Sequence, residues 1–380
     1  FITLFIASTL TLTAQDLLVK RNGERLKVTT LEITTQCVKY VRYNTKLPVS
    51  FVVEGILIMS KPTTGQHYVW RSYLAAWTKT NSADGQIVCL RDKKPFPVSL
   101  TKVAKENCFY GVKELSQQER DIIYGMTVQN AKGVQRYIHE SWLNLYCAPF
   151  DMVEEMTSLG YSILGHTDRV EIEKEQEFKN WNIEYVEKIH GQIERTGLPY
   201  ISSLRQDSLT FWNNEADRDK FSFFLCNQYF RTKKMRDGII TAFEIVKQQM
   251  DCFADIRPEN LWIPLALIYA SDLGVNIAHN YSAVLLQADN ACFIVGDQPV
   301  INTHSTFDMM TAPTDVELFY PVTPHSALLL TTDPKYTSGQ TLIISADEVD
   351  KYNALEQRSA KEMVFAKFCV HLDAFVSPSN

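Results

Sequence analysis

The spacing of apolar residues changes along the chain, from a helical period before residue 280 to a strand period after it. Apolar positions recur every three to four residues in four stretches, which predicts helices over 115–147, 150–160, 168–195 and 258–279. Short apolar runs separated by turn residues then predict strands over 282–288, 291–301, 316–322 and 326–332. A last helix is predicted over 346–368, where the helical period returns.

One further helix, predicted over Asp219–Ile239, has an unusual apolar face. Asn213 or Asn214 is suited to cap its start. Its apolar stripe is interrupted on the same face by Gln228, Arg231 and Thr232. Because unpaired buried polar groups are costly, these side chains need partners elsewhere in the chain. This helix is therefore predicted to carry the polar centre of the fold.

Helices that precede strands without regular alternation indicate an α+β fold, in which a helical body packs on a C-terminal antiparallel β-sheet. Two earlier strands, 86–91 and 96–100, are predicted to form a hairpin around Asp92 to Pro95. The 168–195 helix is heavily charged, and Gly197 and Pro199 are predicted to stop it. No membrane span is predicted within residues 59–380.

The first 58 residues follow a different pattern. Residues 1–15 form an apolar stretch that ends in small residues, which is typical of the end of a secretory signal peptide. Residues 16–58 alternate polar and apolar positions around Asn22-Gly23, which predicts a small N-terminal all-β module. This module resembles the one that follows the signal peptide in many secreted proteins of Bacteroidetes-type bacteria, through Arg21-Asn22-Gly23 and Val38–Tyr43.

The sequence pattern changes at Met59, which resembles the start of an independent protein. Residues 59–380 are therefore predicted to form a separate α+β domain. Residues 1–58 are then a fused or misjoined piece, and Met59 is the natural start of a cytoplasmic protein. The alternative is an exported protein of two modules.

Charge follows the same division. The first 58 residues have seven Lys/Arg and four Asp/Glu, a net charge of +3, which leaves 31 against 40, or −9, for the remainder. An acidic body argues against general coating of nucleic acid, which requires a basic surface. The eight cysteines are scattered without a CxxC pair. They favour buried free thiols over a disulfide framework or a zinc cluster.

Several short motifs occur in a fixed order along residues 60–370. They are His67-Tyr68-Val69, Tyr73-Leu74 with Trp77, Gln228-x-x-Arg231-Thr232, Asp297-Gln-Pro299, Phe319–Pro324, and Asn353 before Ala360. Together they resemble the bacterial domain-of-unknown-function family 4238, whose members open with His-Tyr-Val-Pro. Trp70 stands where the family has Pro, and Gly296 precedes the aspartate where Ser is common. The resemblance implies no particular reaction.

Three residues are candidates for catalysis: His67, Arg231 and Asp297. Asp297 ends an apolar strand, so its carboxylate is suited to a metal, to a general base or to an ion pair with Arg231, with part of a turn as the alternative. Arg231 either binds a phosphate or carboxylate or forms one half of a buried salt bridge. His67 is either a general base or a ligand, with a core histidine that donates to a backbone carbonyl as the alternative. Glu194 is a candidate second carboxylate, with a solvated side chain as the alternative.

Candidate ligand-binding residues surround them: Gln228, Thr232, Arg236 and Asn353. The chain has no GxGxxG, Walker, GxSxG, HExxH or EF-hand pattern, so the cofactor stays unknown and no metal ligands are predicted. Three functions fit these observations. The first is an enzyme acting on a phosphorylated or nucleic-acid substrate. The second is a non-catalytic ligand- or protein-binding module whose polar cluster is structural, and the third is an envelope protein.

Overall fold

The computed structural model describes residues 16–19, 25–33, 38–42, 63–158, 169–306, 311 and 313–376. The chain has a mixed α and β structure and divides into two compact units, Phe1–Lys61 and Pro62–Asn380. In the first unit, β2 (Arg25–Ile33) pairs antiparallel with β1 (Asp16–Val19) and with β3 (Val38–Arg42). The predicted signal peptide, residues 1–15, lies outside the described residues.

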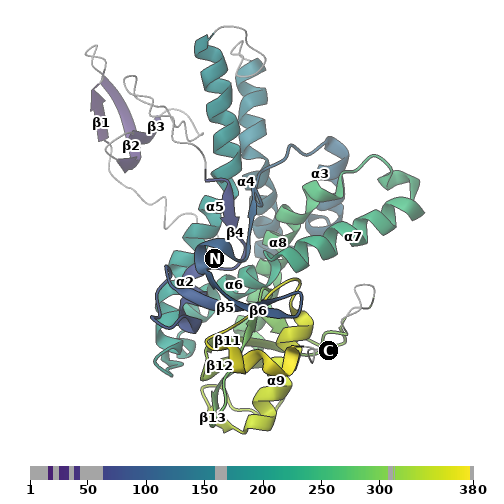
Figure 1. Cartoon of the computed structure of the whole chain (residues 1–380). Helices are drawn as coiled ribbons and strands as arrows, with labels where there is room; N and C mark the ends of the chain where they lie inside the picture. Colours follow the sequence, from purple (N-terminus) through teal and green to yellow (C-terminus); the bar gives the residue numbers. More distant parts are fainter. Residues whose placement is uncertain are drawn as a thin grey trace. The chain divides into compact units, whose positions relative to one another are not determined.

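Helices make up most of the first two thirds of the second unit (Figure 1). Their bounds are α2 (Arg71–Leu74), η1 (Ala75–Trp77), η2 (Leu100–Lys102), α3 (Gln117–Ile123), η3 (Tyr124–Val128), α4 (Gly133–Ser158), α5 (Arg169–Leu204), η4 (Thr210–Asn213), α6 (Glu215–Phe230), α7 (Lys233–Gln249), η5 (Asp251–Phe253) and α8 (Pro258–Asn280). Later in the chain follow α9 (Ala346–Ser359) and η6 (Cys369–Phe375). The long α4 and α5 run side by side, and the hydroxyl of Tyr185 on α5 donates to the Leu145 carbonyl of α4.

The described strands of the second unit form three sheets. A five-stranded sheet has the order β10 (Ile301–Asn302), β11 (Leu318–Thr323), β12 (Ser326–Thr331), β8 (Ser282–Ala288), β13 (Thr341–Ile344). A four-stranded sheet has the order β6 (Lys94–Ser99), β5 (Gln86–Arg91), β14 (Val364–Ala366), β9 (Val295–Gly296), and β4 (Gly65–His67) pairs with β7 (Lys105–Asn107). The prediction of a wholly antiparallel sheet is wrong for β13, which runs parallel to β8.

Helix α8 lies at the centre of the helical part and packs against α4, α6 and α7. Gly274 permits its close approach to α6, because a Cβ atom there would lie 3.0 Å from Cα of Phe223. Within the described residues, α8 is long and apolar enough to cross a membrane. However, 72% of its apolar window is buried inside the fold, as in the core helix of a globular domain.

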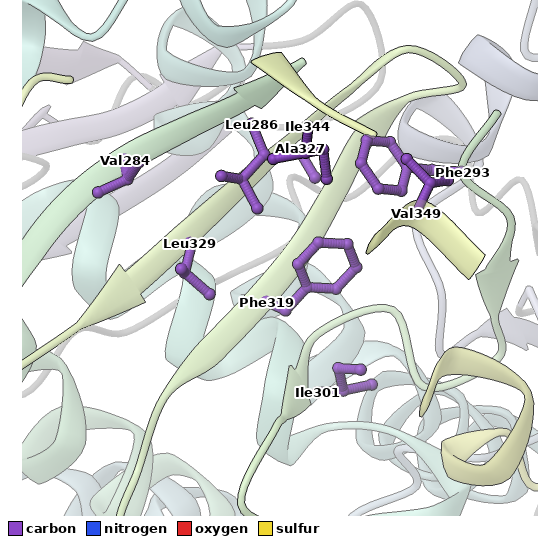
Figure 2. Close-up of a cluster of buried hydrophobic side chains, with 9 residues drawn as sticks. All are labelled: Val284, Leu286, Phe293, Ile301, Phe319, Ala327, Leu329, Ile344 and Val349. Atoms are coloured by element: carbon purple, nitrogen blue, oxygen red, sulfur yellow. The ribbon is translucent and has the colours of Figure 1, made fainter. Parts of the chain in front are cut away.

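The five-stranded sheet has its own hydrophobic core, which α9 covers through Val349 (Figure 2). Side chains that alternate along the strands supply one apolar face, and burial of this face stabilises the layer. The cluster consists of Val284, Leu286, Phe293, Ile301, Phe319, Ala327, Leu329, Ile344 and Val349.

The segment around α2 joins the helical part to this sheet. The Tyr73 hydroxyl donates to the Pro321 carbonyl at 2.6 Å, and its ring stacks on Tyr320 with centroids 4.8 Å apart. The Trp77 indole N–H donates to the Phe293 carbonyl at 2.9 Å. These aromatic residues therefore connect the start of the unit to residues that lie more than 200 positions later in the sequence.

Several predicted elements have different bounds in the structure. The helices predicted over 115–147 and 150–160 are instead α3, η3 and the continuous α4, and the strand predicted over 291–301 is replaced by β9 and β10, which belong to different sheets. The predicted 219–239 helix is broken at Arg231, because the Thr232 side chain accepts from the Met235 N–H and starts α7. Helix α5 continues through Gly197 and Pro199, which were predicted to end it. The last predicted helix stops at Ser359, and residues 364–366 form β14 beside β5.

Candidate functional site

The corner between α6 and α7 directs two neighbouring side chains to different partners. The Arg231 backbone N–H donates to the Asn227 carbonyl at 3.1 Å and closes the last turn of α6. The Arg231 side chain is only 1% exposed and forms an ion pair with Glu194 of α5. The Thr232 hydroxyl donates instead to the side-chain carbonyl of Gln298, in the loop after β9.

Arg231 and Glu194 line a cavity of about 250 Å³. Its other titratable lining residues are His67, Arg71, Tyr110, Glu187 and His190. The volume is slightly below the ~300–1,000 Å³ of sites for drug-sized molecules, which fits a small ligand. Helix α5, the end of α6 and the segment from β4 to α2 together form the walls of this cavity.

One face of α5 provides four of the lining residues. Glu187, His190, Gly191 and Glu194 are spaced by three, four and seven positions, so they project from the same side of the helix. The pKa of Glu187 is raised, first by burial and also by the nearby carboxylates Glu184 and Glu194. This face therefore presents hydrogen-bond acceptors to the cavity.

A second wall of the cavity is formed by the segment that contains His67 and Arg71. Burial, together with the nearby cations Arg71, Lys105 and Arg231, lowers the pKa of His67 to about 4. His67 is therefore neutral at pH 7, with Nε2 at 3.3 Å from the Leu100 carbonyl. If Nε2 donates in that contact, Nδ1 is a lone-pair acceptor and a candidate general base.

His190 is a second neutral imidazole in the cavity wall. Burial lowers its pKa, and the charge of Arg231 lowers it further. Its Nδ1 lies 3.0 Å from the Asn227 side-chain carbonyl, which assigns the proton to that nitrogen. Tyr110 packs on the same ring with centroids 4.4 Å apart, and its hydroxyl donates to the Arg231 carbonyl at 3.3 Å.

Asp297 does not belong to this cavity. Its carboxylate accepts the backbone N–H groups of Lys361, Glu362 and Met363 at 2.6, 3.0 and 3.2 Å. Burial raises the pKa of Asp297 to about 6, although these three donors act in the opposite direction. The predicted ion pair between Asp297 and Arg231 is wrong, because Glu194 is the acid that pairs with Arg231. Asp297 instead fixes the turn that precedes β14.

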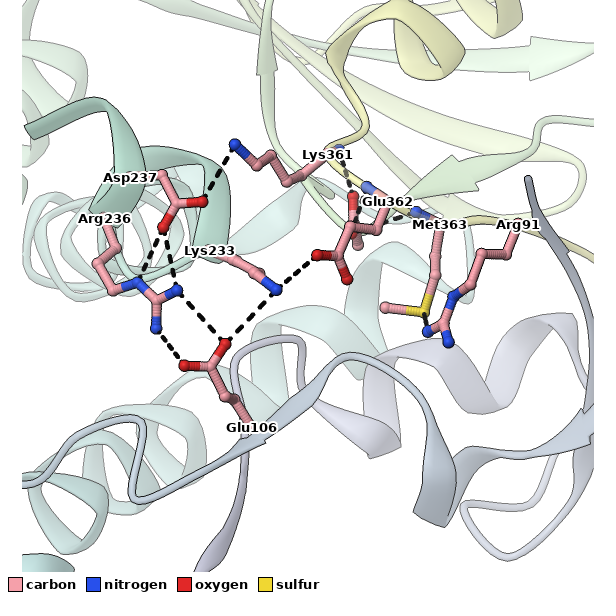
Figure 3. Close-up of polar contacts among 9 residues, drawn as sticks. Arg91, Glu106, Lys233, Arg236, Asp237, Lys361, Glu362 and Met363 are labelled. Carbon is pink, nitrogen blue, oxygen red and sulfur yellow. Dashed lines mark hydrogen bonds and ion pairs between the residues drawn. The ribbon is translucent and has the colours of Figure 1, made fainter. Parts of the chain in front are cut away.

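The four predicted ligand-binding residues also lie outside the cavity lining. Thr232 caps α7, and Asn353 bonds the Ile294 N–H and the Cys292 carbonyl, each at 3.0 Å. The Arg236 guanidinium binds the Glu106 carboxylate at 2.6 and 3.3 Å (Figure 3). The Gln228 side chain is 3% exposed, and its Nε2 has no hydrogen-bond partner among the described residues.

Figure 3 shows that Arg236 belongs to a wider ionic network, which joins α7 to β7 and to the turn held by Asp297. Lys233 lies between Glu106 and Glu362, and Lys361 pairs with Asp237 at 3.1 Å. The network contains three cations, Lys233, Arg236 and Lys361, and three carboxylates, Glu106, Asp237 and Glu362, so its charges compensate one another.

Sequence reasoning missed Arg71, Glu187, His190 and Gly191. The Glu-x-x-His-Gly-x-x-Glu spacing within the charged helix was the available signal, but it was interpreted mostly as a solvated face. Within the described residues, one group of His, Asp and Glu side chains lies close enough to hold a metal ion: Glu215, Asp219 and His279. Glu215 and Asp219 lie near the start of α6, and His279 lies near the end of α8, outside the cavity lining. His279 Nε2 lies 3.6 Å from the Asp219 carboxylate.

A family model described as "Protein of unknown function (DUF4238)" matches residues 65–367. No match was found among curated proteins or among solved structures. The matched segment extends from β4 to the end of the β14 region, so it includes the cavity, the α2 junction and the Asp297 turn. The predicted resemblance is confirmed, and the chain belongs to the DUF4238 family.

Proposed function

We propose that the cavity between α5 and the His67–Arg71 segment binds a small phosphorylated ligand. The main support for this proposal is that two guanidinium groups line the same cavity. Arg231 is fully buried, and Arg71 is partly exposed. Guanidinium groups match the geometry of phosphate oxygens and bind them through paired N–H donors.

Arg71 is the more available of the two cations. Its nearest acidic partner is Asp84, at 3.8 Å, and the side chain of Asp84 is 89% exposed. An exposed ion pair at this distance contributes little to stability, so a phosphate can readily replace Asp84 as the partner of Arg71. Arg231 is already paired with Glu194, and it contributes chiefly a positive potential that also lowers the pKa of His67.

The acidic wall gives the ligand an orientation. A phosphate is repelled by Glu187 and Glu194, whereas hydroxyl or amino groups can donate to them. The phosphate is therefore placed toward Arg71 and His67, with the remainder of the molecule toward α5. In this orientation neutral His67 is a candidate general base, and half-buried Glu187 is a candidate general acid. If they act in these roles, the protein is an enzyme and not only a binding protein.

The Arg71→Ala variant tests the binding step. We expect inorganic phosphate to raise the melting temperature of the wild type more than chloride does at equal ionic strength. Loss of one charge-assisted contact, worth about 1.5–3 kcal/mol, is expected to weaken the phosphate affinity of Arg71→Ala roughly tenfold or more. Calorimetric titration with phosphate measures this affinity directly.

Lys79→Ala is the matched control, because Lys79 is an exposed cation eight positions later that does not line the cavity. It is expected to bind phosphate like the wild type. Equal affinity of the wild type and Arg71→Ala, or equal losses in the two variants, would contradict the proposal.

We also propose that residues 16–58 are a small β module separate from the 59–380 domain, in which helices pack on the C-terminal sheet. The division of the chain after Lys61 supports this organisation. If Met59 is the natural start of the domain, the domain is cytoplasmic, and native protein from fractionated cells should begin there. A mature protein that begins near Gln15 in an exported fraction would favour the two-module alternative.

A further inference from the structure

Helix α5 contains two glycines, and the fold requires only one of them. A Cβ atom at Gly197 would lie 2.3 Å from the Phe224 ring, so packing with α6 excludes any side chain there. A Cβ atom at Gly191 would have no atom within 4 Å. Glycine is destabilising in a helix interior relative to alanine, and nothing in the described part of the chain requires it at position 191.

Gly191 lines the cavity, between the acidic residues Glu187 and Glu194 on the same face of α5. The space that a side chain would occupy is therefore part of the cavity. A bare backbone also lets a ligand approach the helix closely, which is a recurrent use of glycine at binding sites. The absence of a side chain at Gly191 therefore leaves room for a bound molecule and does not affect the packing of the chain.

Aromatic groups line the same cavity. Trp70 and Tyr110 belong to its wall, together with the imidazoles of His67 and His190. The Trp70 ring is held by an edge contact to Phe224, with centroids 6.0 Å apart. Aromatic walls beside an open stretch of backbone are suited to a flat ring, which gains contact area on both faces.

We propose that Gly191 is a specificity-determining residue that makes room for a planar ring on a phosphorylated ligand. The inference rests on the proposed function, since the phosphate places the ring toward α5. The ligand class is accordingly a small phosphomonoester of a ring compound, and phosphates without a ring are bound more weakly.

Two probes and three variants test this assignment. Inorganic phosphate reports on the phosphate position alone, and phenyl phosphate reports on the phosphate and the ring together. The wild type is expected to bind phenyl phosphate roughly tenfold more tightly than inorganic phosphate, because the ring is buried. Gly191→Leu is expected to bind the two probes with similar affinity while its affinity for inorganic phosphate stays within about threefold of the wild type.

Gln192→Leu is the matched control, since it adds the same side chain at the neighbouring, exposed position of α5. It should keep the preference for phenyl phosphate. Gly191→Ala serves as the mild variant if leucine disturbs folding. It should melt at a temperature equal to or above that of the wild type and lose part of the preference.

The outcomes separate the two proposals. An unchanged preference in Gly191→Leu, or equal affinities of the wild type for both probes, would overturn the role of Gly191 and leave phosphate binding intact. Failure of the wild type to bind either probe would overturn both proposals.

Discussion

Glu194→Leu is expected to lower the free energy of unfolding by about 3–5 kcal/mol, because it leaves the Arg231 guanidinium buried without its acid. Arg231→Met is expected to cost less. Glu194 is 19% exposed and lines the cavity, so water can solvate its carboxylate after Arg231 is removed. Denaturant unfolding of both variants measures the two losses.

The double variant Glu194→Leu/Arg231→Met decides whether charge is the cause. Similar apolar side chains in place of both partners leave no charge unpaired, so the double variant is expected to be more stable than Glu194→Leu alone. Lys188→Met is the control, because its pair with Glu184 lies on the same helix with the lysine 58% exposed, and the expected cost is below about 1 kcal/mol. Strictly additive losses would contradict this account of the pair.

The second large effect is expected at Asp297. In Asp297→Asn the side-chain NH₂ group must face at least one of the backbone N–H groups of residues 361–363, which both oxygens of the aspartate accept. We expect a loss of about 2–3 kcal/mol in the free energy of unfolding, from a buried donor without an acceptor. Asp289→Asn, at an exposed position before β9, should be close to neutral.

The pH dependence gives an independent check on Asp297. Its folded pKa of about 6 lies above the ordinary value of 3.8, so the folded state holds a proton that the unfolded state has lost between these values. The contribution of this group to stability is therefore complete below pH 3.8 and lost as the pH rises through 6. The stability difference between the wild type and Asp297→Asn should accordingly be larger near pH 4 than near pH 7. An increase toward pH 7 would contradict the raised pKa.

Much of the secondary structure was predictable from local patterns. The predicted strands 86–91 and 282–288 have the observed bounds, and the predicted 258–279 helix differs from α8 by one residue. One error lies where a single side chain redirects the backbone. Thr232 is a helix N-cap within an otherwise helical sequence, and its preference for that position is an ordinary cap signal.

The opposite error was made in α5. Gly197 and Pro199 are normal signals for the end of a helix, but here the backbone continues because α5 packs on α6 through Phe224. Tertiary packing outweighs a local propensity of about 1–3 kcal/mol at such positions. A single sequence gives no measure of that packing.

The candidate site was predictable only in part. His67, Arg231 and Glu194 were identified from their sequence context, and the cavity brings all three together. Asp297 and Asn353 were selected as polar residues within apolar segments. Both form hydrogen bonds in the structure, but their partners are backbone groups. A buried polar residue signals a required partner, but its sequence neighbours do not reveal whether that partner is a ligand or the main chain.

Residues 231 and 232 form one peptide unit with two attachments, one to Glu194 at the cavity and the other to Gln298 beside the sheet. A displacement of that unit changes both attachments together. We therefore expect a substitution at Gln298 to move the cavity wall at Arg231, because the residue that Gln298 binds is covalently joined to Arg231.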